Sequence, residues 1–155
     1  DKLVQLPLHL GAVAGDRARG FVASLLDPRP VKPATAIDPN VSLFNDSLHD
    51  DEKKLLAELA PLAGDNPRAL QRFVNLYRVA RHAAPQARPA LALALAVETG
   101  AAADEKADFD AFAGGSGAIR APRIKDGLAT AFADELSLDT LANGARIARA
   151  FSLRG

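Results

Sequence analysis

Apolar residues recur every three or four positions over much of the chain, most clearly in the segment between Asn66 and Pro85. This spacing places them on one face of an amphipathic α-helix. Asn66 or Asp65 can cap such a helix through a side-chain oxygen, and Pro67 suits its first position because the missing N–H would have no partner there. The pattern predicts a helix from Pro67 that Pro85 stops. The apolar positions of this helix are Leu70, Phe73, Val74, Tyr77 and Ala80.

The opposite face of this helix is polar and becomes basic in its first turn. Arg68 would be the second helical residue, where the helix dipole disfavours a cation by about 0.3–1 kcal/mol. A bound phosphate reverses that effect, because the helix N-terminus and the guanidinium then act on the same anion. We therefore expect Arg68 to contact any phosphate that the protein handles, with Arg72 assisting or orienting it. The alternative is an exposed Arg68 partly neutralised by Asp65.

Similar patterns predict further helices along the chain. The run ALALALAV that follows Pro89 alternates strictly, as a strand could, but Ala and Leu favour a helix. Asp16 begins a short helix, and Ser47 and Asp50 precede another that has acidic residues in its first turn. The remaining predicted helices include residues 105–113, Ile124 with Leu128 and Phe132, and Leu138 with Leu141, Ile147 and Phe151.

One stretch near the start of the chain has the pattern of a β-strand. Residues 1–10 alternate in polarity, and Pro7 marks the end or the edge of the strand because it cannot donate to a ladder. Residues 11–27 then give a turn and the first helix, residues 28–40 form a Pro-rich linker, and residues 41–155 are helical. The sequence therefore predicts a mostly α-helical fold preceded by one short strand.

Composition limits the functions that this chain can have. Its 155 residues suffice for one domain with a core, and its net charge of zero gives no field for nucleic acid, so we expect no nucleic-acid partner. The chain has no cysteine, no signal peptide and no apolar run long enough for a membrane span, which favours the cytoplasm. It begins at Asp1 and contains no methionine, so we expect it to be part of a longer protein.

Searches for catalytic and metal motifs find no complete apparatus. No G-x-x-x-x-G-K-[ST] loop is present, so the chain itself lacks the donors that hold nucleotide phosphates. Glu98 ends an apolar run but fits an ordinary solvent-facing residue better than a metal ligand, and the histidines have no ligand spacing. The four acidic residues in the 104–110 segment lack the glycine and the final Glu of a calcium loop, and we interpret them as a solvated helix start. They are Asp104, Glu105, Asp108 and Asp110.

Three segments resemble the region in AAA+ and STAND ATPases where the chain leaves the nucleotide-binding core and enters a helical lid. Residues 1–26 resemble the last core strand and the first lid helix. Asn66-Pro67-Arg68 followed by RFVNLYR at residues 72–78 resembles the KAP family of predicted bacterial P-loop NTPases. ARIARAFSLR at residues 145–154 resembles the C-terminal ending of that family. The motifs are short but follow the same order over most of the chain.

This resemblance implies a function that the chain performs only with a neighbouring domain. The Walker A loop and the Mg²⁺-binding acid would precede Asp1, so ATP and Mg²⁺ would be bound in the parent protein and not by this chain alone. The chain would be the lid and C-terminal extension, its partner would be the N-terminal nucleotide-binding core, and Arg68 and Arg72 would contact nucleotide phosphate. Such a lid relays nucleotide state to neighbouring domains or subunits. The alternative is a helical scaffold with no nucleotide role that self-associates or binds a protein partner.

Overall fold

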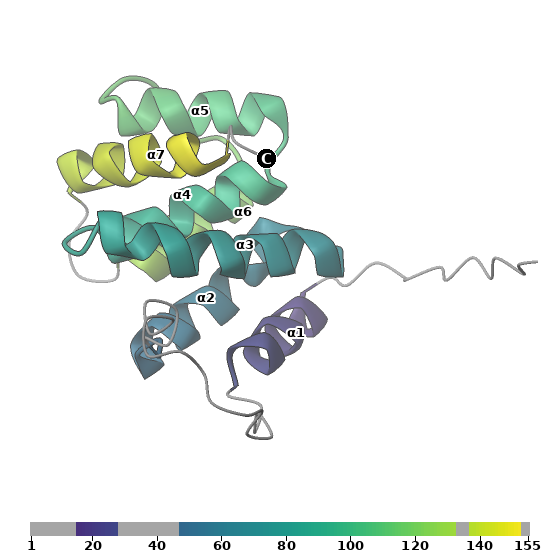
Figure 1. Cartoon of the computed structure of the whole chain (residues 1–155). Helices are drawn as coiled ribbons and strands as arrows, with labels where there is room; N and C mark the ends of the chain where they lie inside the picture. The colour runs from purple at the N-terminus through teal and green to yellow at the C-terminus, as the bar shows by residue number, and fades with distance from the viewer. Residues whose placement is uncertain (1–14, 28–46, 133–136, 153–155) are drawn as a thin grey trace, which may run out of the picture.

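The computed structural model describes residues 15–27, 47–132 and 137–152. Over these ranges the chain forms seven α-helices and one short 3-10 turn, and it forms no strand (Figure 1). The prediction of a mostly helical fold is therefore confirmed for the described residues. The strand predicted at residues 1–10 and the Pro-rich linker predicted at residues 28–40 lie outside them.

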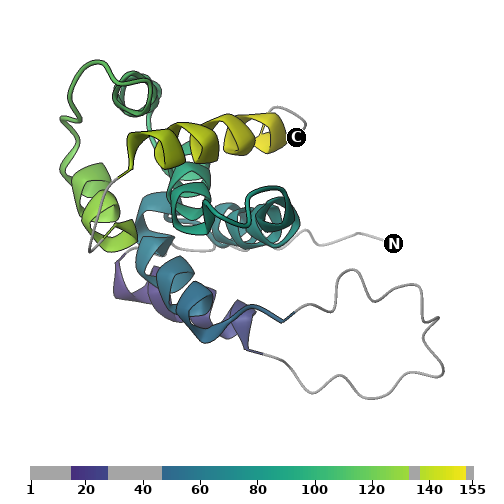
Figure 2. The same ribbon diagram turned by 90° about the vertical axis from the view of Figure 1, so that its left-hand side faces the viewer.

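The helices form two groups around a central pair. Figures 1 and 2 show α1 (Asp16–Leu26) beside α2 (Asp50–Ala63) on one side and α5 (Ala103–Ala113) beside α7 (Leu138–Ser152) on the other. The central pair consists of α3 (Pro67–Ala80) and α4 (Arg88–Gly100), and α6 (Pro122–Ala131) packs against α2 and α4. The elements α3 and α4 are joined through the 3-10 turn η2 (Arg81–Ala83).

Helix α4 is the core of the fold. Eight consecutive residues, Ala90–Val97, are buried, so the helix is apolar on all sides, as expected for an element surrounded by others. It contacts α2, α3, α5, α6 and α7. The strict alternation of Ala and Leu thus belongs to a helix, as predicted, because small and large side chains fit neighbours all round the axis.

Helix α7 approaches the backbone of α4 closely. A Cβ atom at Gly144 would lie 2.7 Å from the Ala90 carbonyl carbon and 2.8 Å from the Leu91 nitrogen. A larger side chain at this position would force the two helices apart, and overpacking of this kind costs about 1–3 kcal/mol. Gly144 therefore allows α7 to cover α4 directly.

Helix α3 follows its sequence prediction in detail. The five predicted apolar positions from Leu70 to Ala80 are all buried, and Phe73 has no exposed surface. The predicted cap is Asn66, whose Oδ1 accepts the Ala69 N–H at 2.8 Å, and Pro67 is the first helical residue. The α-helix ends at Ala80, five residues before Pro85, because the chain tightens there into η2.

Candidate functional site

Arg68 is exposed at the start of α3. It is the second residue of the helix, and among the described residues it forms no hydrogen bond and no ion pair. Asp65 does not neutralise it by an ion pair, contrary to the alternative considered from the sequence. The guanidinium therefore lies at the positive end of the helix dipole without a compensating acidic group within bonding distance.

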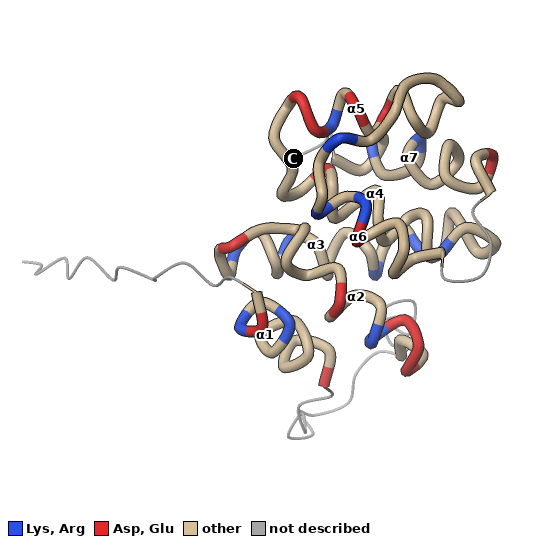
Figure 3. Tube along the Cα trace, turned by 180° about the vertical axis from the view of Figure 1, so that it is seen from behind, with Lys and Arg blue, Asp and Glu red and all other residues tan. Residues whose placement is uncertain are grey.

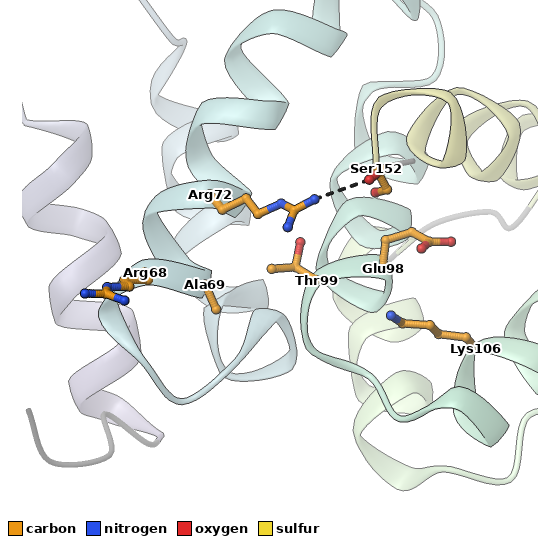
Figure 4. A pocket seen from close by; sticks show the side chains of 7 residues that line it. All are labelled: Arg68, Ala69, Arg72, Glu98, Thr99, Lys106 and Ser152. Atoms are coloured by element: carbon orange, nitrogen blue, oxygen red, sulfur yellow. Dashed lines mark hydrogen bonds between the residues drawn. The ribbon is translucent and has the colours of Figure 1, made fainter. Parts of the chain in front are cut away.

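Arg72, one turn further along α3, has a different environment. Its Nη2 donates a hydrogen bond to the backbone oxygen of Ser152 at 3.2 Å, in the last turn of α7. Carbonyls in the last turn of a helix have no intrahelical partner, so Arg72 satisfies one of them and ties α3 to α7. Figure 4 shows Arg72 pointing toward Ser152 and Arg68 pointing away from it. The structure does not support the expectation that Arg72 orients Arg68.

A cleft of about 390 Å³ lies between the start of α3 and the ends of three other helices (Figure 4). Arg72 lines it from α3, Thr99 from α4 and Lys106 from α5. A second, shallower cleft of about 450 Å³ runs along the outer face of α3. The two predicted site residues, Arg68 and Arg72, line both clefts. The full lining of the first cleft is Arg68, Ala69, Arg72, Glu98, Thr99, Lys106 and Ser152.

Glu98 lines the cleft and is half-buried, and its side chain forms no hydrogen bond or ion pair among the described residues. One sequence interpretation near this cleft needs correction. The acidic residues of α5 are not a simple solvated helix start, because three of them bind arginines from other elements, and Figure 3 shows red and blue segments side by side in this region. The partners lie far away in sequence, so local spacing could not reveal them. These pairs are Glu105–Arg123, Asp108–Arg120 and Asp110–Arg149.

A buried polar cluster at the other end of α3 escaped the sequence interpretation. The carboxylate of Glu52 in α2 accepts three hydrogen bonds. They come from the Tyr77 hydroxyl at 2.8 Å, from Arg81 Nη1 at 2.8 Å and from the backbone N–H of His49 at 2.9 Å. Arg88 Nη1 lies 3.7 Å from the same carboxylate. The Glu52 and Arg81 side chains are 8% and 2% exposed, so this is a buried ion pair. The cluster joins α2, α3, η2 and α4.

The charge state of this cluster follows from its contacts. Burial would raise the pKa of Glu52, but the hydrogen bonds from His49 and Tyr77 and the charges of Arg81 and Arg88 together lower it below its ordinary value. Burial and the adjacent Glu52 carboxylate raise the pKa of the Tyr77 hydroxyl. At neutral pH the cluster therefore contains an ionised carboxylate, a neutral phenol that donates to it, and two cations.

The described residues offer no group of three or more acidic or histidine side chains that could hold a metal ion. None of the described helices combines the length and the apolar composition needed to cross a bilayer. Comparisons with family models, curated proteins and solved structures gave no match to this chain.

Proposed function

We propose that this chain is the helical lid and C-terminal part of a P-loop NTPase of the KAP type, and that Arg68 binds a phosphate of the nucleotide. The observation that carries the proposal is the position of Arg68. It is exposed in the first turn of α3 and has no bonding partner among the described residues. A cation at this end of a helix is unfavourable unless an anion joins it.

The energies favour such a contact. The dipole disfavours Arg68 by about 0.3–1 kcal/mol, whereas a charge-assisted hydrogen bond to phosphate contributes about 1.5–3 kcal/mol. Asn66 already accepts the Ala69 N–H, so the guanidinium is the main donor that this end of α3 offers to a ligand. Arg72 is partly committed to α7, and we assign it a supporting position at the lid surface.

ATP and Mg²⁺ belong to the N-terminal nucleotide-binding core in this proposal. The chain has no Walker A loop, and backbone donors with a lysine supply most of the grip on phosphate in such proteins. We therefore expect the chain alone neither to hydrolyse ATP nor to bind it with micromolar affinity in calorimetry. Micromolar binding would show that the chain is a nucleotide-binding domain in its own right.

The direct test is Arg68→Ala in the intact NTPase. Loss of a phosphate contact worth about 1.5–3 kcal/mol predicts a decrease in ATP turnover of roughly 10- to 150-fold, with the fold retained by circular dichroism. Arg146→Ala is a matched control, because Arg146 is exposed on α7 and bonds only to Asn143, at 2.9 Å, within the described part of the chain. Unchanged turnover in Arg68→Ala would contradict the proposal.

The alternative of a helical scaffold needs a contiguous apolar surface for a partner. The large apolar side chains exposed among the described residues are Val79 on α3, at 48%, and Leu138 at the start of α7, at 44%. They belong to different helices, and isolated exposed apolar residues are ordinary in folded proteins. These two exposed residues therefore give little support to the scaffold alternative.

A further inference from the structure

The cleft between α3, α4, α5 and α7 has the size of a small-molecule site. Its volume of about 390 Å³ lies within the range of about 300–1,000 Å³ that ligand pockets occupy. Its walls come from four helices, so the fold of the chain, and not one loop, determines its shape. In Figure 4 the Lys106 ammonium, the Thr99 hydroxyl and the Arg72 guanidinium face the space between α3, α4 and α5.

Lys106 has no ion-pair partner among the described residues, although it belongs to an acidic helix. It is the only basic residue of α5, and Asp110 lies four positions later on the same face. Asp110 instead binds Arg149 of α7, and the pairs of Glu105 and Asp108 also come from outside α5. The half-buried Lys106 is thus left facing the cleft with its charge uncompensated.

Arg72 and Thr99 supply further hydrogen-bonding capacity. Arg72 donates to Ser152 through one of its two terminal nitrogens, and a guanidinium carries five N–H donors in all. The Thr99 hydroxyl donates to the Leu95 carbonyl at 2.7 Å, so its oxygen lone pairs stay available to accept a hydrogen bond from a protonated ligand oxygen. Arg72, Lys106 and the Thr99 hydroxyl therefore line the cleft and form no hydrogen bond with one another.

The electrostatic balance of the cleft favours an anion. The first turns of α3 and α5 bring positive dipole ends to it, and the last turns of α4 and α7 bring negative ones, so the dipoles oppose one another. The side chains decide the sign, because two cations, Arg72 and Lys106, face the cleft and its lining contains one carboxylate, Glu98. Glu98 forms no ion pair with Lys106 among the described contacts, and Figure 4 shows its carboxylate pointing away from Arg72.

We propose that this cleft binds a small oxyanion, in the form of a phosphate or a phosphate monoester, between Arg72 and Lys106. The site is separate from the nucleotide contact assigned to Arg68, whose side chain points away from Arg72. It does not depend on that assignment, because the cleft is complete within this chain. Because the cleft is open to solvent, we expect its affinity for inorganic phosphate to be weak.

The experiment is a titration of the chain with inorganic phosphate at low ionic strength, followed by NMR chemical shifts. Lys106→Gln should weaken binding by about tenfold, the loss expected for one charge-assisted contact, and Lys106→Arg should largely restore it. Glu98→Gln should tighten binding by a few-fold, because it removes the only like charge in the lining. Lys125→Gln, on the exposed face of α6 and outside the cleft, is the matched control and should change affinity by less than about twofold.

Three outcomes would overturn the site. Equal weakening in Lys106→Gln and Lys125→Gln would show that phosphate binds through general charge attraction. Unchanged affinity in Lys106→Gln, with the variant folded by its thermal unfolding curve, would remove Lys106 from any site. Loss of phosphate binding in Arg68→Gln alone would place the anion at the start of α3 and not in the cleft.

Discussion

Arg68 lies in the first turn of α3 and is exposed, whereas Arg81 follows the last turn and is buried against Glu52. The helix dipole disfavours the first and favours the second. Arg81 donates to Glu52 at 2.8 Å, and Arg68 has no bonding partner among the described residues. The same residue type thus holds helices together at one end of α3 and is exposed without a bonding partner among the described residues at the other.

If the proposed function holds, this contrast separates the residues of α3 that stabilise the fold from the residue that binds a ligand. A buried charge must be paired, because an uncompensated one costs several kcal/mol, and Glu52 provides that pairing at the C-terminal end. An exposed charge costs little to leave unpaired in water, so the N-terminal end can hold Arg68 ready for an anion. Substitutions at the two ends should therefore have effects of different size and, in one case, of opposite sign.

The largest effect is expected from Glu52→Ala. It leaves Arg81 buried without its acidic partner and removes the acceptor of the Tyr77 hydroxyl, so we expect the free energy of unfolding to fall by about 3–5 kcal/mol in urea titration. Asp51→Ala is the matched control, because Asp51 is exposed in the same turn of α2, and its loss should cost no more than about 1 kcal/mol. Equal costs for the two variants would show that the buried cluster does not stabilise this end of α3.

A smaller effect is expected from pH. The pKa of Glu52 is lower in the folded chain than in the unfolded one, so its contribution to stability is complete above about pH 4.5 and is lost as the pH falls through the lower folded value. The glutamine side chain in Glu52→Gln does not ionise, so this variant lacks the pH-dependent contribution to stability. The difference in unfolding free energy between wild type and Glu52→Gln should therefore narrow below about pH 4.5. A difference that stays constant from pH 7 to pH 3 would contradict the lowered pKa.

The smallest effect, and one of opposite sign, is expected from Arg68→Ala. Removal of a cation from the first turn should raise the unfolding free energy by about 0.3–1 kcal/mol in the absence of ligand. Arg78→Ala removes an arginine from the last turn of α3, where Arg78 donates to the Leu25 carbonyl at 3.1 Å. This substitution should lower the unfolding free energy by about 0.5–1.5 kcal/mol. A destabilised Arg68→Ala variant would reveal a structural partner for Arg68 and weaken its assignment to a ligand.

The sequence predicted the helices well because their signals are local. The spacing of Leu70, Phe73 and Tyr77, the Asn66 cap and the Pro67 start all act within a few residues, and each is found in the structure. The helical assignment of residues 90–97 also depended on local propensity and is confirmed. The exposed position of Arg68 followed from the same periodicity.

The contacts that join the helices were not predicted. The bond from Arg72 to Ser152 spans 80 positions, and those from Glu52 to Tyr77 and Arg81 span 25 and 29. No periodicity links such distant residues. One local signal existed, because Arg81 falls four positions after Tyr77 and so continues the buried face of α3. A basic residue on an apolar face indicates a buried acidic partner, but only the structure identifies Glu52 as that partner.

The close contact between α4 and α7 at Gly144 has a consequence for synthesis on the ribosome. Helix α4 is translated before α7, so its apolar surface lacks this cover until α7 has emerged. Nascent chains that expose such surface are prone to aggregation and are substrates for chaperones. The packing of α7 against Ala90 and Leu91 thus covers apolar surface of α4 that the earlier helices leave open.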